Sequence, residues 1–314
     1  MVLLLNITMS MDKSDAEILM EAYIMSGSDI FKNIVEILWR LSPIKKMSKN
    51  AQVSIKHAIF KVTASGIHIN VDHQDLILTN IFLDAKGFTL YKYNHTQPEF
   101  NIGVSLNPLK TFFGDVQKNK NVVFRVRKAM GQTNPTDIEI GISDDDNCSK
   151  GYILSITNEQ NLNINACIEN MYELTSMDTP QFVSLCKFVG NKNHIINIKS
   201  DSSRLVFSKS QVHGMDISWM SCSTSIPNHN YKSNIKSEYI KYLNKMSSFG
   251  TTIQIMKNEP YVIFKSNILS STIKAPALKK NHNLIPISLG TIDVWIKTEP
   301  QLANGATTFL DIEY

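Results

Sequence analysis

Residues 18–38 have the sequence ILMEAYIMSGSDIFKNIVEIL and contain two different spacings of apolar residues. Before Ser28 the apolar side chains largely alternate with other residues, which is typical of a half-buried strand. From Ser28 to Leu41 they recur three and four positions apart, which predicts an amphipathic helix. Ser28 or Asp29 is the expected N-cap, and Pro43 is expected to stop the helix. Residues 18–41 are therefore predicted to form a strand followed directly by a helix. We look for the same unit in the rest of the chain.

Alternating, strand-like runs cover most of the remaining sequence, and three further segments have helical signals. These segments are 107–118, 178–190 and 235–247. The first two begin with a capping residue shortly before a proline, a pairing typical of helix N-termini. The order strand, helix, several strands, helix, several strands thus occurs twice. We therefore expect an α+β protein made of two similar β-rich domains with two helices each.

The domain boundaries follow from this repeat and from local composition. We place the N-terminal domain at 1–157, with its core from about residue 16, and the C-terminal domain at 168–290. The polar segment 158–167, NEQNLNINAC, is the expected interdomain connector. Residues 291–314 form a C-terminal extension to which the sequence assigns no role.

The composition is that of a folded intracellular protein. Of the 314 residues, 43% are apolar, and the formal net charge is +4. The four cysteines include no C-x-x-C pair, so neither a structural zinc site nor a disulfide framework is expected. No segment approaches the roughly 20 apolar residues that span a bilayer. The apolar run after Met1 is too short for a signal peptide. We therefore expect a protein that is not secreted and has no membrane partner.

Candidate catalytic residues are few. The densest group is His68, Asp72, His73 and Asp75, but its spacing matches no metal-binding motif. The sequence also lacks the glycine-rich motifs that bind nucleotide phosphates. We expect no enzyme, no catalytic residue, no metal and no cofactor. A metal-dependent enzyme with a β-rich core is a distant alternative, which a loss of activity on His73→Ala would favour.

Short motifs occur in a fixed order between Ile18 and Pro276. In the first half they are Ser65-Gly66-Ile67, Asp72, Phe88 and Tyr91, followed by Gly103, Val104, Leu106 and Leu109. In the second half they are Tyr242, Leu243, Pro260, Val262 and Phe264, followed by Ile273-Lys274-Ala275-Pro276. In this order they resemble the DNA sliding clamps of the proliferating cell nuclear antigen family. The loops at 43–56 and 223–234 depart from cellular clamps, and with the Asn- and Ile-rich composition they fit a divergent clamp of a large DNA virus.

The resemblance implies a homotrimeric ring in which the helices line the hole and the sheets form the outer wall. Such a clamp encircles double-stranded DNA and, as a processivity factor, tethers a DNA polymerase and other replication or repair factors. Sliding requires attraction to phosphates without base-specific contacts. The helices and the loop 43–56 together hold more net positive charge than the whole chain. The expected DNA contacts are Lys32, Arg40, Lys110, Lys118, Lys187, Lys236, Lys241 and Lys245.

Closing such a ring requires an edge strand of one subunit to pair with an edge strand of the next. By position in the clamp pattern these strands are 151–157 and 214–221. The expected interface residues are Tyr152, Leu154, Ile156, Met215, Ile217 and Trp219. Clamps also bind partner peptides in an apolar pocket. The residues that match this pocket are Val71, Leu76, Leu162, Ile164, Ile273, Ala275 and Pro276.

Each of these assignments has a simpler alternative. The lysines can be ordinary exposed residues of a helix face, the two strands can pair inside their own domains, and the pocket residues can be core and turn residues. For the function, the alternative is a clamp-fold scaffold for transcription or repair proteins that does not encircle DNA. If the clamp interpretation holds, the protein is expected in the nucleus or, if viral, at the site of viral DNA replication.

Overall fold

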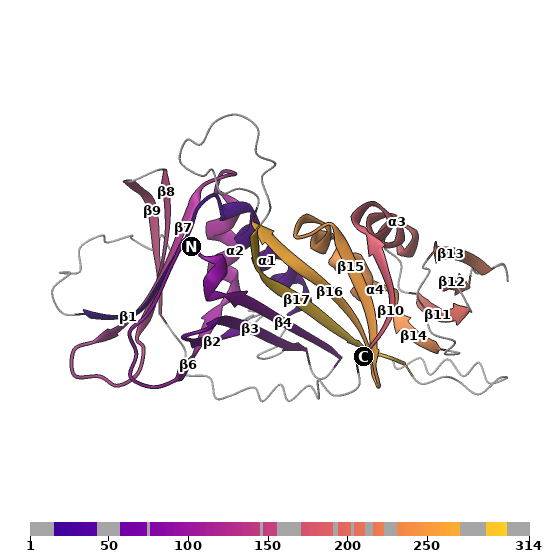
Figure 1. Ribbon diagram of the computed structural model, residues 1–314, viewed down its shortest axis with the longest axis horizontal. Coiled ribbons are helices and arrows are strands. Elements are labelled where there is room, and N and C mark those ends of the chain that lie inside the picture. Colours follow the sequence, from indigo (N-terminus) through magenta and orange to yellow (C-terminus); the bar gives the residue numbers. More distant parts are fainter. Residues whose placement is uncertain are drawn as a thin grey trace, which may run out of the picture.

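The computed structural model shows a mixed α+β protein, with three sheets and four α-helices in its described part (Figure 1). The described residues are 16–42, 57–73, 76–144, 147–155, 171–190, 194–201, 204–210, 216–222, 231–270 and 287–299. No helix in these ranges is both long enough and apolar enough to cross a lipid bilayer.

The elements fall into two halves with similar order. Those of the first half are β1 (Ala16–Ile24), α1 (Ser28–Leu41), β2 (His57–Thr63), β3 (Gly66–His73), β4 (Ile77–Asp84), the 3₁₀-helix η1 (Ala85–Gly87), β5 (Leu90–Tyr93), β6 (Glu99–Ser105), α2 (Leu106–Gly114), β7 (Asn121–Ala129), β8 (Asp137–Asp144) and β9 (Asn147–Ser155). Those of the second half are β10 (Tyr172–Asp178), α3 (Thr179–Val189), β11 (Ile195–Asp201), β12 (Arg204–Ser210), β13 (Asp216–Cys222), β14 (Lys232–Lys236), α4 (Ser237–Tyr242), the 3₁₀-helix η2 (Leu243–Ser248), β15 (Thr252–Asn258), β16 (Tyr261–Ser270) and β17 (Ile287–Lys297).

The order of strands within the sheets repeats as well. The first half contributes β1-β7-β8-β9 to a five-stranded sheet, extended at one edge by β5, and the second half contributes the corresponding order β10-β15-β16-β17. In the same way, β4-β3-β2-β6 of the first half corresponds to β13-β12-β11-β14, the four-stranded sheet of the second. The described part of the second half has no counterpart of β5.

The eight-stranded sheet joins the two halves, because its order is β10-β15-β16-β17-β4-β3-β2-β6. β17 and β4 pair in antiparallel register, from Gly290 opposite Leu83 to Ile296 opposite Ile77. In Figure 1 this sheet crosses the middle of the molecule, with the five-stranded sheet at the left and the four-stranded sheet at the right. The predicted boundary at residue 290 falls inside β17. Backbone pairing of β17 with β16 continues past that residue to Lys297.

The helices form one layer over an apolar core that both halves share. α1 contacts α2 in its own half and α4 and η2 in the other half, and α3 contacts α4 and η2. The apolar stripe predicted for α1 is buried, and it consists of Ile30, Phe31, Ile34, Val35, Leu38 and Leu41. These residues belong to a single cluster that includes side chains from both halves. The layer therefore runs without interruption across the join.

Local signals place the first and third helices correctly, but the cap of α1 differs from the prediction. Ser28 is its first residue and does not cap it. The Ser28 hydroxyl instead donates to the carbonyl of Gln117 at 2.9 Å and accepts from the amide of Lys120 at 3.0 Å. This hydroxyl therefore ties α1 to the turn after α2. In α3, the Asp178 carboxylate accepts from the amide of Gln181, as expected for an N-cap.

The other two helices are shorter than predicted. α2 ends at Gly114, so Lys118 lies in the turn that follows it. The fourth helix begins at Ser237, because Ile235 is buried in β14 and pairs with β11. From Leu243 the chain continues as the 3₁₀-helix η2.

The join between the halves predicts a sharp effect of one substitution. Gly290 has a φ of 155°, and a Cβ there would lie 1.8 Å from the carbonyl oxygen of Phe82 on β4. We expect Gly290→Ala to lower the free energy of unfolding by roughly 2–4 kcal/mol in urea titrations. Gly114→Ala is the control, since a Cβ at Gly114 meets nothing within 4 Å. Its expected effect is within about 0.5 kcal/mol. Equal stability of the two variants would contradict the described join.

Candidate nucleic-acid interface

The exposed and half-buried residues of the helices form a surface on the side away from the core, which we call the helical face. It is made of such residues from α1, α2, α3, α4 and η2. Six of the predicted DNA contacts lie on it, namely Lys32, Arg40, Lys110, Lys187, Lys241 and Lys245. The other two do not lie on a helix. Lys118 is in the turn after α2, and Lys236 is the last residue of β14. The structure thus brings cations from both halves onto one surface.

Contacts on this face hold α1 against α2. Lys32 Nζ donates to the carbonyl of Gly114 at 2.9 Å, at the C-terminal end of α2, where the helix dipole favours a cation. Lys110 Nζ lies 3.1 Å from the centre of the Trp39 ring, in a cation–π contact. The Trp39 ring is itself fixed, because its Nε1 donates to Asn107 Oδ1 at 2.8 Å. These contacts therefore fix the positions of both lysines on the helical face.

Glu36 connects the helices of the two halves. Its carboxylate forms one ion pair with Arg40 on α1 and another, at 3.1 Å, with Lys245 of η2. Burial raises the pKa of Glu36, but the hydrogen bond from Lys245 and the two positive charges outweigh it and hold the pKa below its ordinary value. Lys241 and Arg40 also lie over the Tyr242 ring, 4.7 and 5.9 Å from its centre. Glu36 thus neutralises part of the positive charge predicted for this face.

The remaining predicted DNA contacts differ in whether a nearby carboxylate neutralises their charge. Lys236 Nζ is 3.5 Å from a carboxylate oxygen of Glu299, which reduces its net contribution. Lys118 and Lys187 are exposed, and neither has an ion-pair partner in the described part of the chain. Counting charges along the sequence could not show this difference, because Glu299 is far from Lys236 in the sequence.

Within the described strands, each of the two predicted interface strands has a neighbour on one side only. β9 ends the five-stranded sheet and β13 ends the four-stranded sheet, and their partners within the described strands are β8 and β12. Of the predicted interface residues, Tyr152, Leu154, Ile217 and Trp219 lie in these two strands, whereas Ile156 and Met215 lie outside the described residues. Leu154 is 6% exposed and belongs to the core of its own half. Its side chain therefore packs inside its own half, and only its backbone lies at the sheet edge.

Of the residues predicted to line the peptide pocket, only Val71 and Leu76 lie in the described part of the chain. Val71 is 2% exposed and lies in the main core, on the helix side of β3, so it cannot line an outer pocket. Leu76 is half-buried against the same core. The other predicted pocket residues lie outside the described residues, and they are Leu162, Ile164, Ile273, Ala275 and Pro276.

An apolar cluster that the sequence did not indicate lies on the other face of the eight-stranded sheet. Leu78 of β4, Trp295 of β17 and Ile263 of β16 are direct neighbours across three strands. Ile263 and Trp295 are only 1% and 4% exposed, and Met256 and Tyr261 pack against them. The alternation of each strand is visible in the sequence, but the neighbourhood of β4 and β17 is not. This cluster spans the join between the halves.

In the described ranges, no group of three or more His, Cys, Asp and Glu side chains could hold a metal ion. His68 stacks on Phe82 instead, with ring centres 4.5 Å apart. Burial and the positive charge of Lys61 lower the pKa of His68. Asp75, from the same sequence group, lies outside the described residues.

Comparison with known proteins identifies a viral relative of similar length. The chain is 37% identical over 306 residues to uncharacterized protein 436R of Invertebrate iridescent virus 6. The match covers 93% of this chain and 97% of that protein. No protein-family model matches the chain.

The Glu36 contacts predict a pH-dependent contribution to stability. Because folding lowers the pKa of Glu36, its stabilising effect is present above the ordinary pKa and is lost as the pH falls through the lowered one. At pH 7 we expect Glu36→Gln to cost about 0.5–1 kcal/mol of unfolding free energy, measured by urea titration. This difference from the native protein is expected to shrink towards pH 3. The control is Glu99→Gln, which breaks a more exposed ion pair with Lys61. An effect of Glu36→Gln that does not change with pH would contradict the assignment.

Proposed function

We propose that this chain, which belongs to the family of protein 436R of Invertebrate iridescent virus 6, is a DNA sliding clamp. It forms a closed ring around duplex DNA and tethers a polymerase and other replication or repair factors to it. It acts as a processivity factor and carries out no reaction itself. The observation that carries the proposal is the pair of open sheet edges, β9 and β13, considered together with the join between the halves.

The internal repeat indicates which strands complete these edges. β17 is the last strand of the second half, and it pairs with β4, the third strand after the first helix. β9 is the last strand of the first half, and β13 is the third strand after α3. The counterpart of the β17–β4 pairing is therefore a pairing of β9 with β13. Since β9 and β13 lie at opposite ends of the molecule (Figure 1), β9 pairs with β13 of another copy.

Such a contact joins two different edges of identical chains. Head-to-tail contacts of this kind continue until a ring closes or a filament grows. Closure covers both open edges, which would otherwise favour aggregation. Three copies, as in the clamps that the sequence resembles, would place six similar units around the ring. Because the helical layer already crosses the β17–β4 join, the equivalent joins between copies continue it around the hole.

The helical face supports contact with DNA inside this ring. Its cations come from both halves, and Lys187 is exposed, with no carboxylate partner in the described part of the chain. Binding through phosphates is independent of base sequence and allows movement along the duplex. Glu36 moderates the charge near the middle of the layer. A moderate attraction suits a protein that is required to slide.

Two parts of the proposal rest on the resemblance alone. The surface that tethers a polymerase was predicted mainly from residues in 158–167 and 271–286, which lie outside the described residues. The place of action, in the nucleus or at a site of viral DNA replication, follows from the proposed role in replication.

Duplex binding, measured by fluorescence anisotropy at several salt concentrations, tests the role of the helical face and of Lys118 in the turn after α2. We expect the double variant Lys118→Gln/Lys187→Gln to bind two unrelated duplexes equally weakly. Its slope of log affinity against log salt is expected to fall by about 1.8, which is roughly 0.9 for each lost phosphate contact. Glu36→Gln is expected to raise the affinity, because it removes a negative charge from the same face.

The matched control for this experiment is Lys297→Gln, which removes an exposed lysine at the end of β17. Its affinity and salt slope are expected to equal those of the native protein. An assembled protein that does not bind duplex DNA would contradict the clamp and favour a scaffold that does not encircle DNA.

A further inference from the structure

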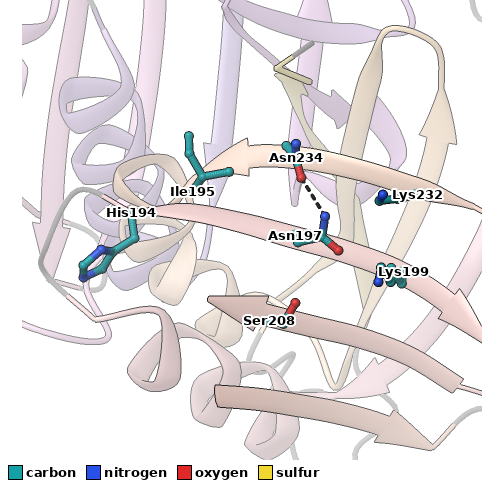
Figure 2. Close-up of a pocket in the computed structure, with 7 residues that line it drawn as sticks. All are labelled: His194, Ile195, Asn197, Lys199, Ser208, Lys232 and Asn234. Carbon is teal, nitrogen blue, oxygen red and sulfur yellow. Dashed lines mark hydrogen bonds between the residues drawn. The ribbon is translucent and has the colours of Figure 1, made fainter. Parts of the chain in front are cut away.

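A polar pocket lies on the outer face of the four-stranded sheet (Figure 2). Its volume is about 350 Å³, and it is lined by residues of β11, β12 and β14 and by His194, directly before β11. Strand alternation explains its polarity. Ile196 and Ile198 of β11 are completely buried in the core, so Asn197 and Lys199 face the opposite way. The pocket uses no residue of the helical face.

Two cross-strand pairs form the centre of this pocket. Asn197 lies opposite Asn234, and Lys199 lies opposite Lys232, on the neighbouring strands β11 and β14. Asn197 Nδ2 donates to Asn234 Oδ1 at 2.8 Å, as the dashed line in Figure 2 shows. Ser208 of β12 lines the pocket on the other side of β11.

This arrangement costs free energy in two ways. Residues directly opposite each other on antiparallel strands have Cβ atoms about 5 Å apart, and like charges at that distance are destabilising. Lys199 has no ion-pair partner among the residues that the structure describes, and Glu299 is already engaged by Lys236. In addition, Asn197 Oδ1 is buried, and no described group donates a hydrogen bond to it. Together these features indicate a ligand that brings both negative charge and a hydrogen-bond donor.

We propose that this pocket binds a phosphate monoester with a neighbouring hydroxyl group, which is the chemistry of a mononucleotide. The phosphate dianion accepts from the ammonium groups of Lys199 and Lys232 and removes their mutual repulsion. A ligand hydroxyl donates to Asn197 Oδ1, and Ser208 offers a further polar contact. The volume lies in the range of small-molecule sites. The proposal does not depend on DNA in the hole of a ring, so it is independent of the clamp function.

Isothermal titration calorimetry of the full-length protein with adenosine 5′-monophosphate tests this proposal. We expect saturable binding to the native protein. Lys199→Gln and Lys232→Gln are each expected to weaken it about tenfold or more, since each removes a charged hydrogen bond. Adenosine, which lacks the phosphate, and inorganic phosphate, which lacks the sugar, are each expected to bind about tenfold more weakly. Lys297→Gln is the control and is expected to keep the native affinity.

Absence of nucleotide binding to the native protein would overturn the proposal, and so would equal binding to Lys199→Gln. Binding of a short oligonucleotide without a terminal phosphate, but not of the mononucleotide, would assign the pocket to the DNA backbone and overturn it as well. Unfolding of the variant is checked by thermal melting. Because Lys199→Gln removes a repulsion, its melting temperature without nucleotide is expected to equal or exceed that of the native protein. The nucleotide is expected to raise the melting temperature of the native protein more than that of either lysine variant.

Discussion

The antiparallel pairing of β17 with β4 is the interaction on which the rest of the structure depends. It merges strands from residues far apart in the sequence into one eight-stranded sheet. Because the sheet is continuous, the core beneath it and the layer of helices are continuous too. The same repeat leaves β9 and β13 as the edge strands of the described sheets, at the two ends of the molecule. The proposed assembly, in which β9 pairs with β13 of another copy, is therefore a consequence of how the two halves are joined.

Electrostatics reinforces the join on the helix side. Glu36 of α1 holds Lys245 of η2, so a carboxylate of one half is fixed by a cation of the other. The same carboxylate binds Arg40, which lies over the Tyr242 ring. The cations that the clamp interpretation assigns to DNA therefore also hold the helices together. Substituting them changes both the stability and the charge of the face, and the two effects need separate measurements.

Features that depend on a few neighbouring residues could be predicted from the sequence. The apolar stripe of α1 and the Asp178 cap of α3 follow from local spacing alone. Features that depend on which strands pair could not be predicted from the sequence. Val71 is apolar, as a pocket residue is expected to be, but the alternation of side chains along β3 directs it into the core. Likewise, the cluster around Trp295 exists only because β17 lies beside β4. The charge of the helices and their expected position in the fold predicted the candidate DNA face. The ion pair of Glu36 with Lys245 on that face could not be predicted, because it joins residues far apart in the sequence.

The solution mass of the protein, measured by light scattering over a range of concentrations, tests the central claim most directly. Pairing of β9 with β13 between copies predicts a mass of three subunits that does not change with concentration. A persistent monomer would contradict the pairing. A mass that grows steadily with concentration, as in an open filament, would contradict the closure of the ring.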